Sequence, residues 1–138
     1  MTIRTHVQIV GALLLMLGLA HAFFPRYFGW AKELAPLSLL TRRIFQVHSF
    51  FIALVVVLLG ACSLFYADTL LQSTPLSRIF LAGIVLFWVC RLFVQFFVYD
   101  STIWRGNRLY TSMHIAFSML WIYVVVTYAL ALRTVTLG

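Results

Sequence analysis

Four long apolar runs, separated by short polar segments, dominate the pattern of this chain. Each run has about 18–24 residues, and a helix of roughly 20 residues crosses about 30 Å of hydrocarbon. The pattern therefore predicts an all-α polytopic membrane protein, a four-transmembrane-helix bundle that forms a single domain over residues 1–138. The predicted spans are Val7–Phe24, Ile44–Tyr66, Ile79–Tyr99 and Leu109–Leu132.

The segments between the spans differ in character. Residues 25–43 form the longest connection, and they carry apolar side chains at helix-like spacing beside charged ones. This spacing predicts a short amphipathic segment lying at the membrane interface. Residues 67–77 are typical of an exposed turn, with Ser77 as a possible helix cap. The apolar residues of the first connection are Trp30, Leu34, Leu37 and Leu40.

Composition supports a membrane protein over a soluble one. Hydrophobic residues make up 64% of the chain and charged residues 9%, whereas soluble domains carry roughly 25% charged residues. The net charge of +7 does not indicate nucleic-acid binding, because the basic residues are spread over the ends of apolar runs. We therefore expect the lipid bilayer as a partner and no nucleic acid.

The basic residues also predict an orientation. Four spans place both termini on one side, which carries Arg4, Arg78 and Arg133. The opposite side carries Arg26, Lys32, Arg42, Arg43, Arg105 and Arg108. By the positive-inside rule the second side is cytoplasmic. We expect an integral protein of a bacterial inner membrane with both termini outside the cytoplasm.

Three histidines near the predicted cytoplasmic ends of different spans are the main candidates for function. His21, His48 and His114 have matching depths, Gln95 lies at the same depth, and Arg91 lies about one turn deeper. Arg91 is the one Lys or Arg in the four runs, which contain no Asp or Glu. Ionisable residues inside a bilayer are costly and tend to mark function.

Small and polar residues recur on one face of each span. Glycine on such a face lets a neighbouring helix or a flat ligand approach closely. The face of the third span is a stripe at i, i+4 and i+8 formed by Arg91, Gln95 and Tyr99. The corresponding sets on the other spans are Gly11, Gly18 and His21; Ser49, Ala53 and Gly60; and Asn107, Thr111, His114, Ser118 and Trp121.

The preferred interpretation is a haem b or transition-metal site that supports membrane electron transfer. Two of the three histidines would be axial haem ligands with Arg91 or Arg108 near the propionates, or all three would bind one zinc, copper or iron ion. A pigment that takes a single histidine is also compatible. Side chains able to hold the ligating histidines by hydrogen bonds are Gln95, Thr111, Ser49 and Asp100.

Other interpretations of the polar cluster stay open. It would suit a quinone or another lipid-soluble ligand, with His and Arg donating to carbonyl oxygens. It would also suit a proton or anion pathway, or simple interhelical hydrogen bonding. The last case predicts a small non-catalytic accessory subunit of a larger membrane complex, or a homo-oligomer. No catalytic motif assigns an enzyme class, and the absence of carboxylates in the spans argues against a di-iron carboxylate site.

Overall fold

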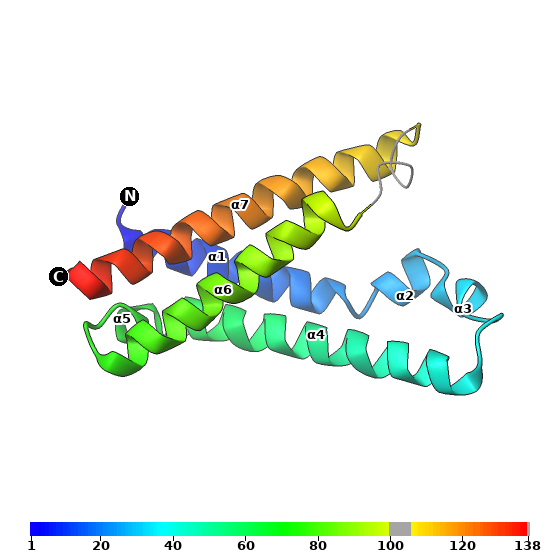
Figure 1. Ribbon diagram of the computed structural model, residues 1–138, viewed down its shortest axis with the longest axis horizontal. Helices are drawn as coiled ribbons and strands as arrows, with labels where there is room; N and C mark the ends of the chain where they lie inside the picture. The colour runs from blue at the N-terminus through cyan, green and yellow to red at the C-terminus, as the bar shows by residue number, and fades with distance from the viewer. Residues whose placement is uncertain (100–105, 138) are drawn as a thin grey trace. The chain divides into compact units, whose positions relative to one another are not determined.

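The computed structural model describes residues 1–99 and 106–137. Helices account for 84% of these residues, and no strand occurs among them. Figure 1 shows the helices in chain order. Asp100, expected to hold a histidine, and Arg105, counted among the cytoplasmic charges, lie outside the described residues.

Four of the helices are long and apolar enough to cross a membrane, which confirms the predicted four-helix transmembrane class. Each begins before its apolar run, and the fourth also ends beyond its run, whereas the first three end one to four residues inside theirs. A capping side chain can satisfy free backbone N–H groups at such a start. For example, Ser38 accepts a hydrogen bond from the Thr41 backbone N–H at 3.2 Å, at the start of the second long helix. The four are α1 (Ile3–Ala20), α4 (Leu39–Phe65), α6 (Pro75–Phe97) and α7 (Arg108–Leu137).

The connection after α1 folds differently from the single amphipathic segment expected there. It contains two one-turn helices, α2 (Phe24–Tyr27) and α3 (Trp30–Glu33). Gly29 separates them with φ of 62°, a left-handed conformation that glycine adopts without steric cost. Because α1 ends at Ala20, His21 lies in the turn that follows the helix rather than one turn inside it.

The connection before α6 is more ordered than the exposed turn expected from the sequence. It contains α5 (Ala67–Leu70), whose first and last residues are both buried. The cap of α6 is Thr74, which accepts a hydrogen bond from the Ser77 N–H at 3.1 Å, with Pro75 following it. Ser77 lies inside α6 and donates to the Thr69 carbonyl at 3.1 Å, so it is not the cap.

The chain divides into two compact units. Residues 8–67 form the α1–α4 unit, and residues 1–7 with 68–138 form the α6–α7 unit. In the α1–α4 unit the two long helices are antiparallel and their backbones touch at glycines (Figure 1). A Cβ on Gly11 would lie 2.5 Å from the Leu64 nitrogen, and one on Gly60 would lie 2.8 Å from the Leu15 nitrogen. The predicted close approach at the glycine faces is thus confirmed.

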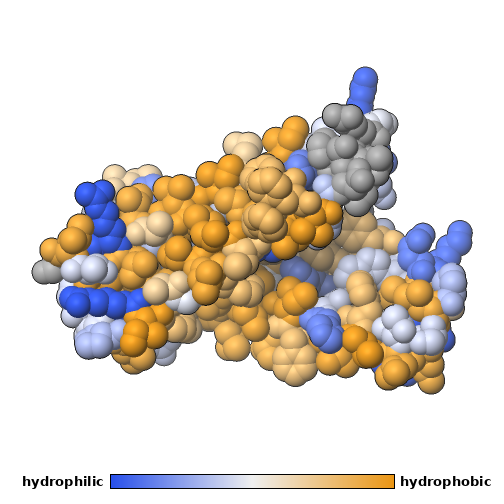
Figure 2. Space-filling model, in the orientation of Figure 1, coloured by the Kyte–Doolittle hydropathy of each residue, from blue (hydrophilic) through white to orange (hydrophobic). Residues whose placement is uncertain are grey.

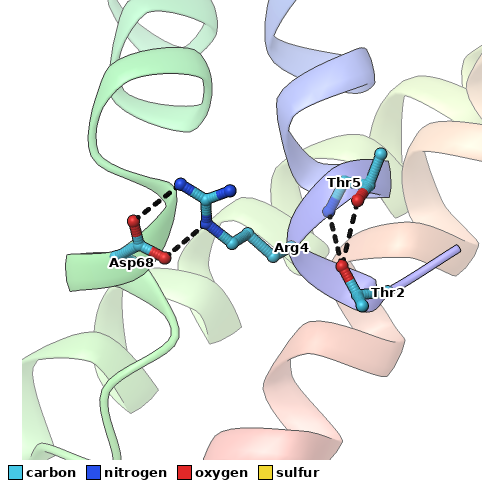
Figure 3. Close-up of polar contacts among 4 residues, drawn as sticks. All are labelled: Thr2, Arg4, Thr5 and Asp68. Carbon is cyan, nitrogen blue, oxygen red and sulfur yellow. Dashed lines mark hydrogen bonds and ion pairs between the residues drawn. The ribbon is translucent and has the colours of Figure 1, made fainter.

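In the α6–α7 unit the two antiparallel helices pack along their length (Figure 1). At one end, Arg78 donates to the Val135 carbonyl at 3.0 Å. Arg4 holds Asp68 through two hydrogen bonds of 2.5 and 2.9 Å, as Figure 3 shows. Nearby, Thr2 Oγ1 accepts from the Thr5 N–H and so satisfies one free donor of the first turn of α1 (Figure 3).

Apolar side chains cover much of the face seen in Figure 2. A large exposed apolar surface is costly in water but suits contact with lipid tails. The finding fits an integral membrane protein in contact with a lipid bilayer. Strongly exposed examples from the four long helices are Leu19, Phe50, Phe97 and Met119.

Candidate functional site

A chain of hydrogen bonds links three of the predicted site residues in the α6–α7 unit. The Nη1 of Arg91 donates to Oε1 of Gln95 at 3.2 Å. One helix across, Nδ1 of His114 lies 2.9 Å from Nε2 of Gln95. Gln95 is 4% exposed and Arg91 and His114 are half-buried. The i, i+4 spacing on α6 and the matching depth on α7 therefore bring these side chains together, as expected.

The chemistry of Arg91 fixes the direction of every bond in this chain. A guanidinium only donates, so the oxygen of the Gln95 amide must face Arg91 and its NH₂ group must face His114. The Nδ1 of His114 is then an acceptor, and the neutral ring carries its proton on Nε2. Ligation of a metal through Nε2 would require the opposite tautomer, with a proton on Nδ1 directed at the Gln95 NH₂ group.

Aromatic rings surround the guanidinium of Arg91. Its Cζ lies 4.9 Å from the ring centroid of Trp121 and 5.7 Å from that of Tyr99. Trp121 in turn stacks on Trp88, with centroids 4.9 Å apart and planes inclined by 21°. The electron-rich faces of these rings partly compensate a cation held away from water. Both tryptophans are buried, so they pack within the α6–α7 unit.

Arg91 has no carboxylate partner within residues 1–99 and 106–137. The salt bridge found in this part of the chain joins Arg4 and Asp68 instead. A guanidinium has five N–H donors, and Gln95 accepts from one of those of Arg91. The side chain therefore retains hydrogen-bonding capacity within an apolar helix pair.

His21 and His48 share a different arrangement within the α1–α4 unit. The Nδ1 of His21 lies 2.8 Å from the Leu17 carbonyl, and the Nδ1 of His48 lies 2.9 Å from the Ile44 carbonyl. A carbonyl only accepts, so each Nδ1 carries the proton and each neutral ring has its lone pair on Nε2. A backbone carbonyl on Nδ1 is a common partner of histidines that bind a metal through Nε2.

The structure therefore sorts the five predicted site residues into two sets. Arg91, Gln95 and His114 meet in the α6–α7 unit, whereas His21 and His48 belong to the α1–α4 unit. In neither unit do the described residues group three or more His, Cys, Asp or Glu side chains that could hold a metal ion. Of the other expected partners of the histidines, Thr111 donates to the Asn107 carbonyl and Ser49 lines a cavity.

That cavity is a feature that the sequence analysis missed. It has a volume of about 840 Å³, and every residue that lines it belongs to the α1–α4 unit. The signal in the sequence was the combination of small residues on facing helices with a helix-ending proline and basic residues in the connection. The polar lining residues are His21, Arg26, Arg42, Gln46 and Ser49, and the small ones include Gly18, Ala22 and Ala53.

Comparison of the chain with protein-family models, with curated proteins and with solved structures gave no match. The function must therefore be argued from the residues themselves. The α6–α7 unit offers cationic and neutral N–H donors at membrane depth. The α1–α4 unit offers two imidazole lone pairs and a cavity with basic and apolar walls.

Proposed function

We propose that this protein is a membrane subunit that binds a quinone-class, lipid-soluble redox ligand beside Arg91, Gln95 and His114. The observation that carries the proposal is the charge of Arg91, which has one hydrogen-bond acceptor and no carboxylate partner among the described residues. Ionisable residues inside a membrane commonly mark substrate or ion pathways. The remaining N–H groups of Arg91 would be satisfied by an acceptor oxygen on a ligand that enters from the membrane.

A quinone matches this requirement in both polarity and solubility. Its two carbonyl oxygens accept hydrogen bonds and donate none, and its ring and tail partition into the apolar phase. Arg91 supplies donors, and the Gln95 amide keeps it oriented along α6. The nearby rings of Tyr99 and Trp121 provide apolar surface around the guanidinium. The proposal covers binding in support of membrane electron transfer, and it names no catalytic residue.

Equilibrium titration of the purified protein with a short-chain ubiquinone tests this function. We expect saturable binding that quenches tryptophan fluorescence and that Arg91→Leu weakens by about tenfold or more, since a hydrogen bond to a charged group is worth roughly 1.5–3 kcal/mol. Arg133→Leu is the matched control, because Arg133 is exposed on α7. Absence of saturable binding, or equal affinity of the two variants, would contradict the proposal.

A second candidate is ligation of haem or a transition metal by His21 and His48. The observation that favours it is the shared Nδ1–H···O=C bond, which leaves the ligating Nε2 lone pair available in both rings. A reduced-minus-oxidised absorption spectrum detects haem, and elemental analysis of the same sample detects a colourless metal. We expect His21→Ala and His48→Ala to lower the cofactor content and His6→Ala to leave it unchanged. A single-histidine pigment would depend on one of the two alone.

The location and partners form a further part of the proposal. The distribution of basic residues supports a bacterial inner membrane with both termini outside the cytoplasm. The exposed apolar faces of the long helices suit lipid and also neighbouring membrane subunits or further copies of the chain. A subunit of this kind would hold the redox ligand while a partner completes the electron-transfer path.

A further inference from the structure

The cavity of the α1–α4 unit has other lining residues than the proposed quinone site, and it has its own chemistry. Residues of α1, α4 and the α2–α3 segment line it. The ring of Trp30 on α3 packs against Phe45 on α4, with centroids 4.9 Å apart, and so holds the segment against the long helix. Its volume of about 840 Å³ falls within the range of about 300–1,000 Å³ typical of small-molecule sites.

Basic and polar side chains make one part of this cavity suitable for binding an anionic group. Arg26 and Arg42 contribute two positive charges, and His21 and Gln46 contribute further polar atoms. The Nε of Arg42 is buried and has no hydrogen-bond partner among the described residues. A buried guanidinium N–H without an acceptor costs free energy, and an anionic oxygen placed beside it would recover that cost.

The remaining walls of the cavity are apolar and lie on the two long helices. Gly18 on α1 faces Ala53 and Val57 on α4, and both helices contribute such residues to the lining. A Cβ at Gly18 would clash with Val57, so the two helices are in close contact here and the cavity is lined by residues beside this contact. The cavity therefore combines a cationic end with an apolar continuation, which matches a molecule with an anionic head and hydrocarbon chains.

We infer that this cavity binds one anionic phospholipid molecule, with its phosphate beside Arg26 and Arg42 and an acyl chain along Gly18 and Ala53. Bidentate hydrogen bonding to phosphate is the characteristic strength of arginine. Anionic lipids attract basic residues at membrane surfaces. The charge complementarity of the cavity thus selects an anionic over a zwitterionic lipid of the same chain length.

Native mass spectrometry of the purified full chain tests this inference. The probes are palmitoyl-oleoyl phosphatidylglycerol and palmitoyl-oleoyl phosphatidylcholine, which differ in the headgroup only. We expect a one-to-one phosphatidylglycerol adduct that binds at least about tenfold more tightly than phosphatidylcholine. Arg42→Gln and Arg26→Gln should each reduce this preference by a similar factor. Lys32→Gln is the matched control, because it removes one charge from the same segment at an exposed position outside the cavity.

A second pair of variants tests the apolar part without altering a charge. Ala53→Phe fills the cavity and should weaken the phosphatidylglycerol adduct, whereas Ala82→Phe, at an exposed position on α6, should not. Thermal unfolding of each variant identifies any that fails to fold. If one arginine variant fails to fold, the other arginine variant tests the charged end, and if Ala53→Phe fails to fold, the two arginine variants carry the test. Equal binding of the two lipids, or an adduct unaffected by both the arginine and the Ala53 variants, overturns the inference. Displacement of the lipid by millimolar inorganic phosphate also overturns it, because the site would then recognise free phosphate.

Discussion

Gln95 on α6 donates a hydrogen bond to Nδ1 of His114 on α7 across 2.9 Å, while its oxygen accepts from Arg91. One buried amide therefore joins two membrane helices and orients a membrane-depth cation. An ionised glutamate at this position would add a second charge, and a leucine would remove the hydrogen bonds that Arg91 and His114 make to Gln95. Glutamine donates and accepts without carrying a charge at any pH.

A double-mutant cycle measures how strongly Gln95 and His114 are coupled. We expect Gln95→Leu and His114→Leu each to lower the free energy of unfolding, and the pair to show a coupling of about 0.6–1.7 kcal/mol, as interhelical hydrogen bonds in membranes do. The measurement is reversible unfolding in mixed detergent micelles. Strict additivity of the two substitutions would show that the hydrogen bond contributes nothing to stability.

Glycine-to-alanine substitutions test the close packing of α1 against α4. Gly60→Ala should destabilise the protein by about 1–3 kcal/mol, because the new methyl group would lie 2.8 Å from the Leu15 nitrogen and a backbone must move. Gly83→Ala is the control, since nothing lies within 4 Å of a Cβ at that helical position. Melting temperatures of the two variants give the comparison, and equal values would show that the backbones are not in contact.

The Arg4–Asp68 pair predicts a pH dependence at the end of the α6–α7 unit. The hydrogen bonds from Arg4 hold the pKa of the Asp68 carboxyl below its ordinary value, with the positive charge of Arg4 acting in the same direction. A lowered folded-state pKa contributes stability above the unfolded value of about 3.9, and this contribution is lost as the pH falls through the folded-state pKa.

Comparison of the native protein with Asp68→Asn across this range measures that contribution. We expect a higher melting temperature for the native protein at about pH 6, well above the ordinary Asp pKa of about 3.9. The difference should shrink progressively as the pH falls below that value, because the folded-state pKa of Asp68 is lowered. The difference at pH 6 should shrink in high salt, because both side chains are exposed. A difference that does not shrink as the pH falls below the ordinary Asp pKa would mean that Asp68 acts through something other than its charge.

Reporter fusions test the orientation inferred from the basic residues. With an even number of spans, fusions at residues 1 and 138 should report the same side of the membrane. We expect a periplasmic reporter such as alkaline phosphatase to be active at the C-terminus and inactive when it is inserted after Glu33. Activity only at the position after Glu33 would reverse the orientation and place both termini in the cytoplasm.

Much of the fold follows from the sequence because hydrophobic length is a strong constraint. The four spans, the glycine-containing faces of α1 and α4 and the stripe formed by Arg91 and Gln95 depend on helical spacing alone. Which helix packs against the glycines was set by the tertiary structure. The helix ends were harder to predict. Thr74 rather than Ser77 caps α6, and the signal was the Thr-Pro pair, since proline favours the first turn and threonine the position before it.

The candidate site was also predicted only in part from the sequence. Depth along a helix placed Gln95 and His114 together, because both lie near the same end of adjacent spans. Depth did not predict that the three histidines differ in their hydrogen bonds. The Nδ1 of His114 accepts from Gln95, whereas the Nδ1 atoms of His21 and His48 donate to backbone carbonyls four residues earlier. A tautomer depends on which group faces the ring, and no residue spacing records that.

The sequence by itself determined that this protein is helical, that it enters a membrane, and which faces of its helices are polar. These properties depend on the composition and periodicity of each segment, because the bilayer requires every span to satisfy its own backbone. Tertiary structure alone decided that the α2–α3 segment and the long helices of its unit line a cavity, and that Gln95 hydrogen-bonds both Arg91 and His114. Both results depend on side chains from different helices meeting at hydrogen-bonding distance or leaving space between them, which only the packed arrangement sets.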